Sequence, residues 1–129
     1  MVMNEGELSA GLAQTSNYRY ADRVGGRLFV AGQVPVDSER TVVGDDAAAQ
    51  AAQCLRNLFT LVEHHGFSRG DIHQLTVYVV GPHANLIAAW KQVRAEFDDN
   101  VPPATLLGVT VLGFVGQLVE IDAVIERAV

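Results

Sequence analysis

The 129 residues fit a single domain, and a chain of this length hides roughly two-thirds of its unfolded surface on folding, which is enough for a sizeable core. A net charge of −6 and a sequence pI near 5.0, without any cluster of Lys or Arg, disfavour binding to nucleic acid or to anionic membranes. Apolar stretches stay well short of the ~20 residues that span a bilayer, and the N-terminus is acidic, so we expect a cytoplasmic protein.

The first part of the chain predicts an arm followed by a hairpin. Residues 1–16 are small, polar and aperiodic, and are expected to form a loosely ordered arm. Strand-like runs follow over residues 18–24 and 27–31. They are joined by Gly25 and Gly26, which supply the positive φ angles of a tight turn.

The middle of the chain predicts two helices around one strand. Apolar side chains recur at three- and four-residue spacing over residues 47–65, which is typical of an amphipathic helix, and Gly66 ends it. Residues 72–80 alternate between apolar and polar side chains and are expected to form a strand. A second helix is predicted from Pro82 to about residue 98.

The last two strands, about residues 104–112 and 116–127, are separated by a short glycine-containing connection and are expected to pair as a hairpin. Because successive side chains of a strand alternate, Glu120 and Asp122 share one face and the core positions share the other. The order β-β-α-β-α-β-β predicts a two-layer α+β sandwich with both helices on one face of the sheet. We expect one domain over residues 1–129, whose uncovered sheet face meets solvent or a partner.

The cysteine and histidine residues predict no metal site. Cys54 is the only cysteine and lies in a helical apolar pattern, which favours a buried filler over a nucleophile. His64 and His65 fall at a helix C-terminus, where a capping or solvated role is expected. His73 and His83 are isolated and lack the spacing of a zinc-binding helix.

Several segments, in order from Tyr18 onward, carry a family resemblance. They are Phe-Val-Ala-Gly-Gln-Val-Pro-Val-Asp at residues 29–37, Gln50, Asn57, Leu58 and Gly66 in the first helix, Pro-Ala-Thr-Leu-Leu-Gly-Val at 103–109, and Leu-Val-Glu-Ile-Asp-Ala at 118–123. Together they resemble the RidA/YjgF family of imine and enamine deaminases. The resemblance implies a chorismate-mutase-like fold, a homotrimer with clefts between subunits, a small-molecule substrate and no cofactor.

The same resemblance implies roles for individual residues. In deaminases of this family an arginine binds the carboxylate of a 2-imino or 2-enamino acid, and a glutamate on the last strand positions the water that attacks the C=N carbon. Glu120 matches that glutamate and would be the catalytic residue, while Tyr18 matches a cleft tyrosine and would contact the substrate. Such chemistry needs mainly orientation and proton transfer.

Other positions depart from the family pattern. Thr105 stands in place of the arginine, Ala31 where a cleft serine is common, and Leu107 at a small or polar position. With Phe114, these residues are expected to line a more apolar substrate pocket. A charge-assisted bond contributes ~1.5–3 kcal/mol, so its loss predicts roughly tenfold or more weaker binding of a small imino acid. Residues 102–109 resemble arginine-lacking branches of the family, including sequences similar to 2-aminomuconate deaminases.

The leading hypothesis is therefore a homotrimeric RidA-like deaminase, a hydrolase acting on an enamine or imine with more apolar bulk than a simple imino acid. A non-catalytic small-molecule binder or scaffold trimer, or another reaction with Glu120 as general acid, is the alternative. Glu120 also fits an interfacial carboxylate paired with Arg27 or another strand residue. Tyr18 fits an anchor on a neighbouring subunit, and Thr105 fits an ordinary β-branched strand residue. Arg19 and Arg27 are the candidates for restoring the missing charge.

Overall fold

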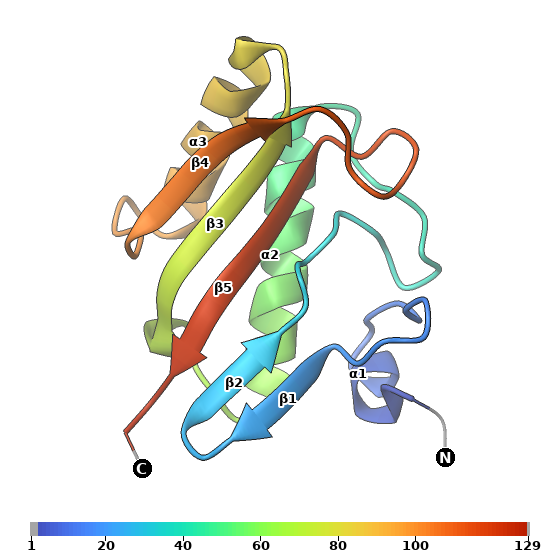
Figure 1. Cartoon of the computed structure of the whole chain (residues 1–129), viewed down its shortest axis with the longest axis vertical. Coiled ribbons are helices and arrows are strands. Elements are labelled where there is room, and N and C mark those ends of the chain that lie inside the picture. The colour runs from blue at the N-terminus through green and yellow to red at the C-terminus, as the bar shows by residue number, and fades with distance from the viewer. Residues whose placement is uncertain (1–2, 129) are drawn as a thin grey trace.

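The computed structural model describes residues 3–128. Within that range the chain forms a five-stranded mixed sheet with α2 and α3 on one of its faces (Figure 1). The strands are β1 (Ala21–Val24), β2 (Arg27–Val30), β3 (Ile72–Val80), β4 (Ala104–Val109) and β5 (Val119–Glu126). The helices are α1 (Glu5–Ser9), α2 (Ala47–His64) and α3 (His83–Glu96), with a single 3-10 turn at Arg69–Asp71. The predicted two-layer α+β sandwich is confirmed.

Helix α2 lies along the sheet and supplies much of the core. Asp46 caps its N-terminus, because the Asp46 carboxylate accepts a hydrogen bond from the backbone N–H of Ala49 at 2.8 Å. Gly66 follows its C-terminus with φ +82°, a backbone conformation that glycine adopts without strain. The buried face of α2 includes Ala51, Cys54, Leu55, Leu58 and Val62, which pack against the apolar face of β3 and β5.

The predicted pairing of the last two strands is wrong. The sheet order is β1-β2-β5-β3-β4, so β5 lies between β2 and β3 while β4 forms an edge (Figure 1). β4 runs parallel to β3, from Leu75 opposite Ala104 to Val80 opposite Val109. Parallel neighbours need a crossover connection, which α3 provides, and residues 110–118 then carry the chain past β3. A central β5 places Glu120 in the interior of the sheet.

The N-terminal segment differs from the loosely ordered arm expected from its composition. It contains α1, and the side chains of Leu12 and Ala13 are buried. The Tyr20 hydroxyl donates a hydrogen bond to the backbone carbonyl of Ala13 at 2.8 Å. A helix of only five residues leaves too short an apolar pattern for sequence periodicity to reveal. The segment packs beside the C-terminal end of α2, and β1 begins at Ala21 instead of residue 18.

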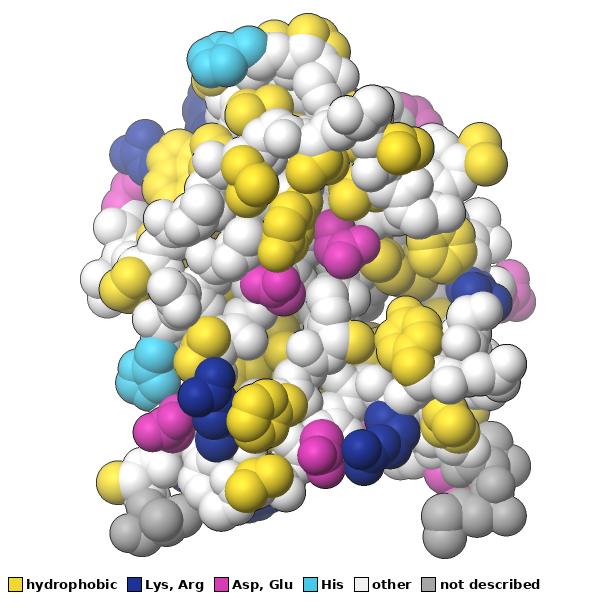
Figure 2. All heavy atoms as spheres, in the orientation of Figure 1, with side chains coloured by type: hydrophobic (Ala, Val, Ile, Leu, Met, Phe, Trp, Pro, Cys, Tyr) yellow, Lys and Arg dark blue, Asp and Glu magenta, His cyan; other side chains and the backbone are white. Residues whose placement is uncertain are grey.

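The sheet face opposite the helices carries both apolar and acidic side chains (Figure 2). Val24, Phe29 and Leu107 are exposed hydrophobic residues on strands β1, β2 and β4. Glu120 and Asp122, on β5, are half-buried. None of the described helices is both long and apolar enough to cross a bilayer.

Candidate functional site

On the sheet face opposite the helices, the side chains of β4, β3 and β5 form two rows that run across the strands. The register places Leu107, Tyr78 and Glu120 in one row and Thr105, Thr76 and Asp122 in the next. Neighbouring strands lie roughly 5 Å apart, so the backbone of Thr105 or Leu107 is about 10 Å from that of β5. Within one chain, Tyr78 therefore separates Leu107 from Glu120.

Tyr78 links the two rows. Its hydroxyl donates a hydrogen bond to Asp122 Oδ2 at 3.0 Å. This bond raises the pKa of Tyr78, and burial and the charges of Asp122 and Glu120 raise it further. Sequence reasoning treated Tyr78 only as a strand residue, because its nearness to the two carboxylates depends on the pairing of β3 with β5, which the sequence did not reveal.

Glu120 lies against the chain that follows β2. Gln33 and Ile121 exchange two backbone hydrogen bonds, at 2.7 and 3.0 Å, which hold this segment beside β5. A Cβ atom at position 32 would lie 3.1 Å from Glu120 Cδ and would overlap the carboxylate. Any larger residue at this position would force the end of the Glu120 side chain to shift. The Gln117 amide donates a further hydrogen bond to Glu120 Oε1 at 3.3 Å.

Tyr18, Gly32 and Phe114 line one small pocket with the N-terminal segment and the loop after β2. Its volume within one chain is about 10 Å³, comparable to the space that one water molecule occupies. The Glu120 carboxylate contacts Gly32, one of the residues that line this pocket, although Glu120 itself does not line it. Any ligand larger than water must therefore extend beyond the pocket of a single chain.

The remaining sequence-predicted site residues lie elsewhere in the single chain. Ala31 lines a separate open hollow with Phe29 and Val30 on the outer side of the first hairpin. Thr105 and Leu107 are exposed on the edge strand β4. The structure thus brings Tyr18 and Phe114 together near Glu120, and leaves Ala31, Thr105 and Leu107 outside that group.

Neither of the two arginines considered from the sequence lines the pocket. Arg19 forms an exposed ion pair with Asp22 at 3.3 Å. The Arg27 guanidinium lies 4.8 Å from the centre of the Phe29 ring, and its residue stands opposite Glu126 in the sheet. The proposed pairing of Arg27 with Glu120 therefore does not occur within the chain.

Arg40 is the arginine at the pocket, and sequence reasoning missed it. It lines the same pocket as Tyr18, with its guanidinium 5.4 Å from the centre of the Phe114 ring. The turn that carries it is held by Asp37, whose carboxylate accepts backbone hydrogen bonds from Glu39 and Thr41 at 2.9 and 3.0 Å. Within residues 3–128 Arg40 forms no ion pair. An irregular polar loop gave no periodic pattern from which to place it.

Two buried glutamines hold the loop that carries Phe114. Gln50 Nε2 donates hydrogen bonds to the carbonyls of Gly116 at 2.9 Å and Gly44 at 3.2 Å, and Gln50 Oε1 accepts one from the Leu118 N–H at 2.6 Å. The Gln117 side chain accepts a hydrogen bond from the Phe114 N–H at 3.1 Å. Helix α2 and the β4–β5 connection therefore position one wall of the pocket together.

Cys54 is fully buried beneath this region, as the sequence predicted. Burial raises the pKa of its thiol, and the charge of Glu120 raises that pKa further. The thiol is therefore held in its protonated, unreactive form.

Comparison with known proteins gives the family. Residues 9–127 match the protein family described as Endoribonuclease L-PSP. The 2-iminobutanoate/2-iminopropanoate deaminase of Salmonella typhimurium is 31% identical over 106 residues, which are 81% of this chain and 82% of the relative. A RutC family protein of Pyrococcus horikoshii is 34% identical over 88 residues, which are 67% of this chain and 68% of the relative.

Solved structures share the fold over almost the whole chain. The YjgF gene product of Escherichia coli has a TM-score of 0.78 at 28% identity, covering 99% of this chain and all of that one. The E. coli protein TdcF, solved with bound serine, has a TM-score of 0.77 at 24% identity and covers 99% of both chains. The mixed sheet with two covering helices is thus a YjgF-type, chorismate-mutase-like fold. The chain belongs to the RidA/YjgF family.

Proposed function

We propose that this protein is a RidA-like deaminase that hydrolyses an enamine or imine and releases ammonia, with Glu120 as its catalytic residue. The observation that carries this proposal is the contact of the Glu120 carboxylate with Gly32, which lines the same pocket as Tyr18 and Phe114. The family relatives that act as 2-iminobutanoate/2-iminopropanoate deaminases support the reaction class. The family description also names an endoribonuclease, but a net charge of −6 disfavours binding to an RNA backbone.

The proposed reaction needs one carboxylate, that of Glu120, to transfer a proton. Glu120 accepts a proton from a water molecule as the water oxygen attacks the C=N carbon, and the proton then passes to the nitrogen. The resulting carbinolamine collapses to a carbonyl compound and ammonia. An enamine is first protonated at carbon to give the imine. The hydrogen bond from Gln117 to Glu120 Oε1 leaves Oε2 as the oxygen directed toward Gly32.

The substrate class is inferred from the charges around the pocket. Thr105 and Leu107 are uncharged, as in an arginine-lacking branch of the family, so we assign the anionic end of the substrate to Arg40, which has no ion-pair partner within residues 3–128. The apolar end would then lie toward Leu107. Since the pocket of one chain holds about one water, the complete site requires a neighbouring chain, and we propose a homotrimer with the cleft between subunits.

The test is ammonia release from a panel of 2-imino acids and bulkier enamines generated in situ. We expect Glu120→Gln to lose roughly a hundredfold or more of the activity, because general acid–base catalysis typically contributes 10²–10⁴-fold. Glu126→Gln is the matched control, since Glu126 lies on the same strand but is exposed and far along it. Wild-type activity no greater than buffer across the panel, or equal effects of the two variants, would refute the proposal.

A second candidate is a small-molecule-binding trimer without turnover. Thr105 favours it, because this uncharged residue stands where the family's carboxylate-binding arginine is expected. This candidate predicts that ligands raise the melting temperature but release no ammonia. A different acid/base reaction in the same cleft would instead give turnover without ammonia, with a pH profile controlled by Glu120.

A further inference from the structure

We propose that Glu7, His64 and His65 form a binding site for a divalent transition-metal ion of the zinc type, which ties α1 to the C-terminal end of α2. The site lies outside the pocket near Glu120 and does not depend on the proposed reaction. Sequence reasoning predicted no metal site and gave His64 and His65 a capping or solvated role. Glu7 is far from the two histidines in the sequence, so no motif with fixed spacing joins the three.

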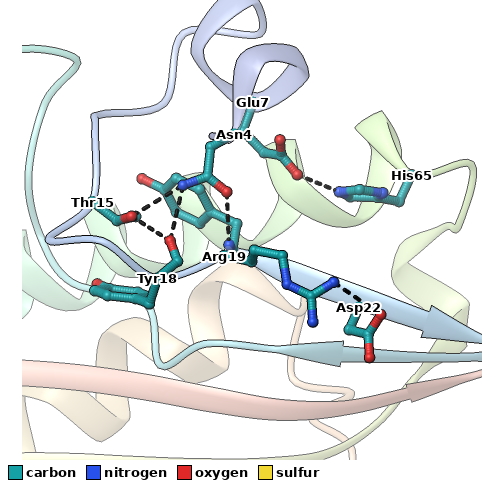
Figure 3. A network of polar contacts seen from close by, with 8 residues as sticks. Asn4, Glu7, Thr15, Tyr18, Arg19, Asp22 and His65 are labelled. Carbon is teal, nitrogen blue, oxygen red and sulfur yellow. Dashed lines mark hydrogen bonds and ion pairs between the residues drawn. The ribbon is translucent and has the colours of Figure 1, made fainter. Parts of the chain in front are cut away.

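The three side chains converge. One potential ligand atom from each of Glu7, His64 and His65 lies within 4.8 Å of the other two. Glu7 Oε2 is 2.6 Å from His65 Nε2, and Glu7 is only 7% exposed although it is ionisable. Figure 3 shows the Glu7 carboxylate on α1 directed at the His65 ring at the end of α2. Binding of one zinc-type ion would draw these atoms together to about 3.3 Å from one another, since its bonds to nitrogen and oxygen are about 2.0–2.2 Å long.

The end of α2 allows two consecutive histidines to face the same point. Successive residues in a continuing helix point about 100° apart. Helix α2 stops at His64, however, and His65 is its C-cap with φ −88° and ψ 10°. The two rings then meet edge to face with their centres 5.0 Å apart. Gly6 makes room for His64 on α1, because a Cβ atom there would lie 2.5 Å from His64 Nε2.

The donor set selects the type of ion. Two imidazole nitrogens and one carboxylate oxygen suit Zn²⁺ and its transition-metal neighbours, with water as a fourth ligand. Mg²⁺ and Ca²⁺ prefer all-oxygen ligands. The ion pair of Glu7 with His65 explains those two residues without a metal, but it leaves the His64 side chain without a hydrogen bond within residues 3–128. A metal ion would engage all three.

Metal binding here would also affect the pocket wall, through α1. Asn4, the residue before α1, donates hydrogen bonds from its side chain to Thr15 Oγ1 and to the Tyr18 carbonyl, both at 3.0 Å. Its side-chain oxygen accepts a third bond from the Tyr20 N–H at 2.9 Å. Figure 3 shows this network and the Glu7–His65 pair at the same short helix. A metal that fixes α1 would therefore also stabilise the position of Tyr18.

The experiment uses the full-length, tag-free protein after chelator treatment. Calorimetric titration with Zn²⁺ is expected to give one ion per chain, and Co²⁺ should give the visible absorption bands of a four-coordinate site. Zn²⁺ should also raise the melting temperature. We expect His64→Gln to weaken Zn²⁺ binding by roughly tenfold or more, since it removes one of three protein ligands. His73→Gln is the control, because His73 is an exposed histidine on β3 and contacts the Glu126 carbonyl.

His64→Gln decides the question because His64 is exposed and takes no part in the Glu7–His65 pair, so the variant should fold even if Glu7→Gln does not. No stoichiometric binding to the wild type would overturn the proposal. Equal Zn²⁺ affinity of wild type and His64→Gln would also overturn it and leave Glu7–His65 as a simple ion pair. A loss of affinity in the His73→Gln control would assign the ion to a different site.

Discussion

Gln50 offers a direct test of how α2 holds the loop of the candidate site. The Gln50→Ala variant removes three hydrogen bonds. The carbonyls of Gly44 and Gly116 belong to exposed residues and can bond to water instead, so each loss costs about 0.5 kcal/mol. Leu118 is half-buried, and leaving its N–H unpaired costs about 1–3 kcal/mol. The free energy of unfolding should therefore fall by about 3 kcal/mol.

The assay is thermal and urea unfolding at one fixed protein concentration, because association between chains would make stability depend on concentration. For a chain of this length 1 kcal/mol corresponds to about 3–5 °C, so the melting temperature of Gln50→Ala should fall by about 10 °C. The matched control is Gln92→Ala, which removes a single surface bond to Glu96 on α3 and should change the melting temperature by about 2 °C at most. If both variants melt within about 2 °C of the wild type, Gln50 does not hold the loop as described.

Three further predictions follow from single contacts. Gly32→Ala should displace the Glu120 carboxylate and lower ammonia release by roughly tenfold or more with little change in melting temperature, and unchanged kinetics would contradict the contact. Burial raises the pKa of Tyr20 to about 12, with a smaller contribution from nearby negative charges, so the folded state holds the phenol proton more tightly than the unfolded state. This difference contributes up to about 2–3 kcal/mol to the free energy of unfolding, and the contribution is complete below pH 10 and lost as pH rises toward 12. The free energies of unfolding of wild type and Tyr20→Phe, measured with urea, should therefore converge over that range. Asp122→Asn should lower the pKa of Tyr78, which absorbance titration of the phenolates will detect, and an unshifted titration would exclude the hydrogen bond as the cause.

Local patterns were sufficient for most elements but not for their pairing. The periodicity over residues 47–65 and the alternation over residues 72–80 predicted α2 and β3 closely, because burial of one face imposes those periods. The pairing of the last strand could not be read in this way. The alternation of side chains along β5 is compatible with any neighbouring strand. β5 can lie between β2 and β3 because the crossover through α3 carries β4 to the far edge of β3.

The candidate site was predicted only in part, because some of its contacts are made between segments that are distant in the sequence. The position of Glu120 on β5 follows from strand alternation. Arg40 lies on a turn that is defined by hydrogen bonds to Asp37, and nothing in the local sequence shows which surface that turn approaches. Glu7 approaches His65 across 58 positions of sequence, so no motif with fixed spacing could reveal the pair. Such contacts depend on the tertiary fold.

The central place of β5 has a consequence for how the protein is made. β5 follows the other four strands in the sequence but lies between β2 and β3, so these two strands have no shared neighbour until β5 has been made. Until then both expose strand edges that other nascent chains can pair with. Loss of β5 (Val119–Glu126) would divide the sheet into two separate ribbons, β1-β2 and β3-β4, so the fold should tolerate little damage to this strand.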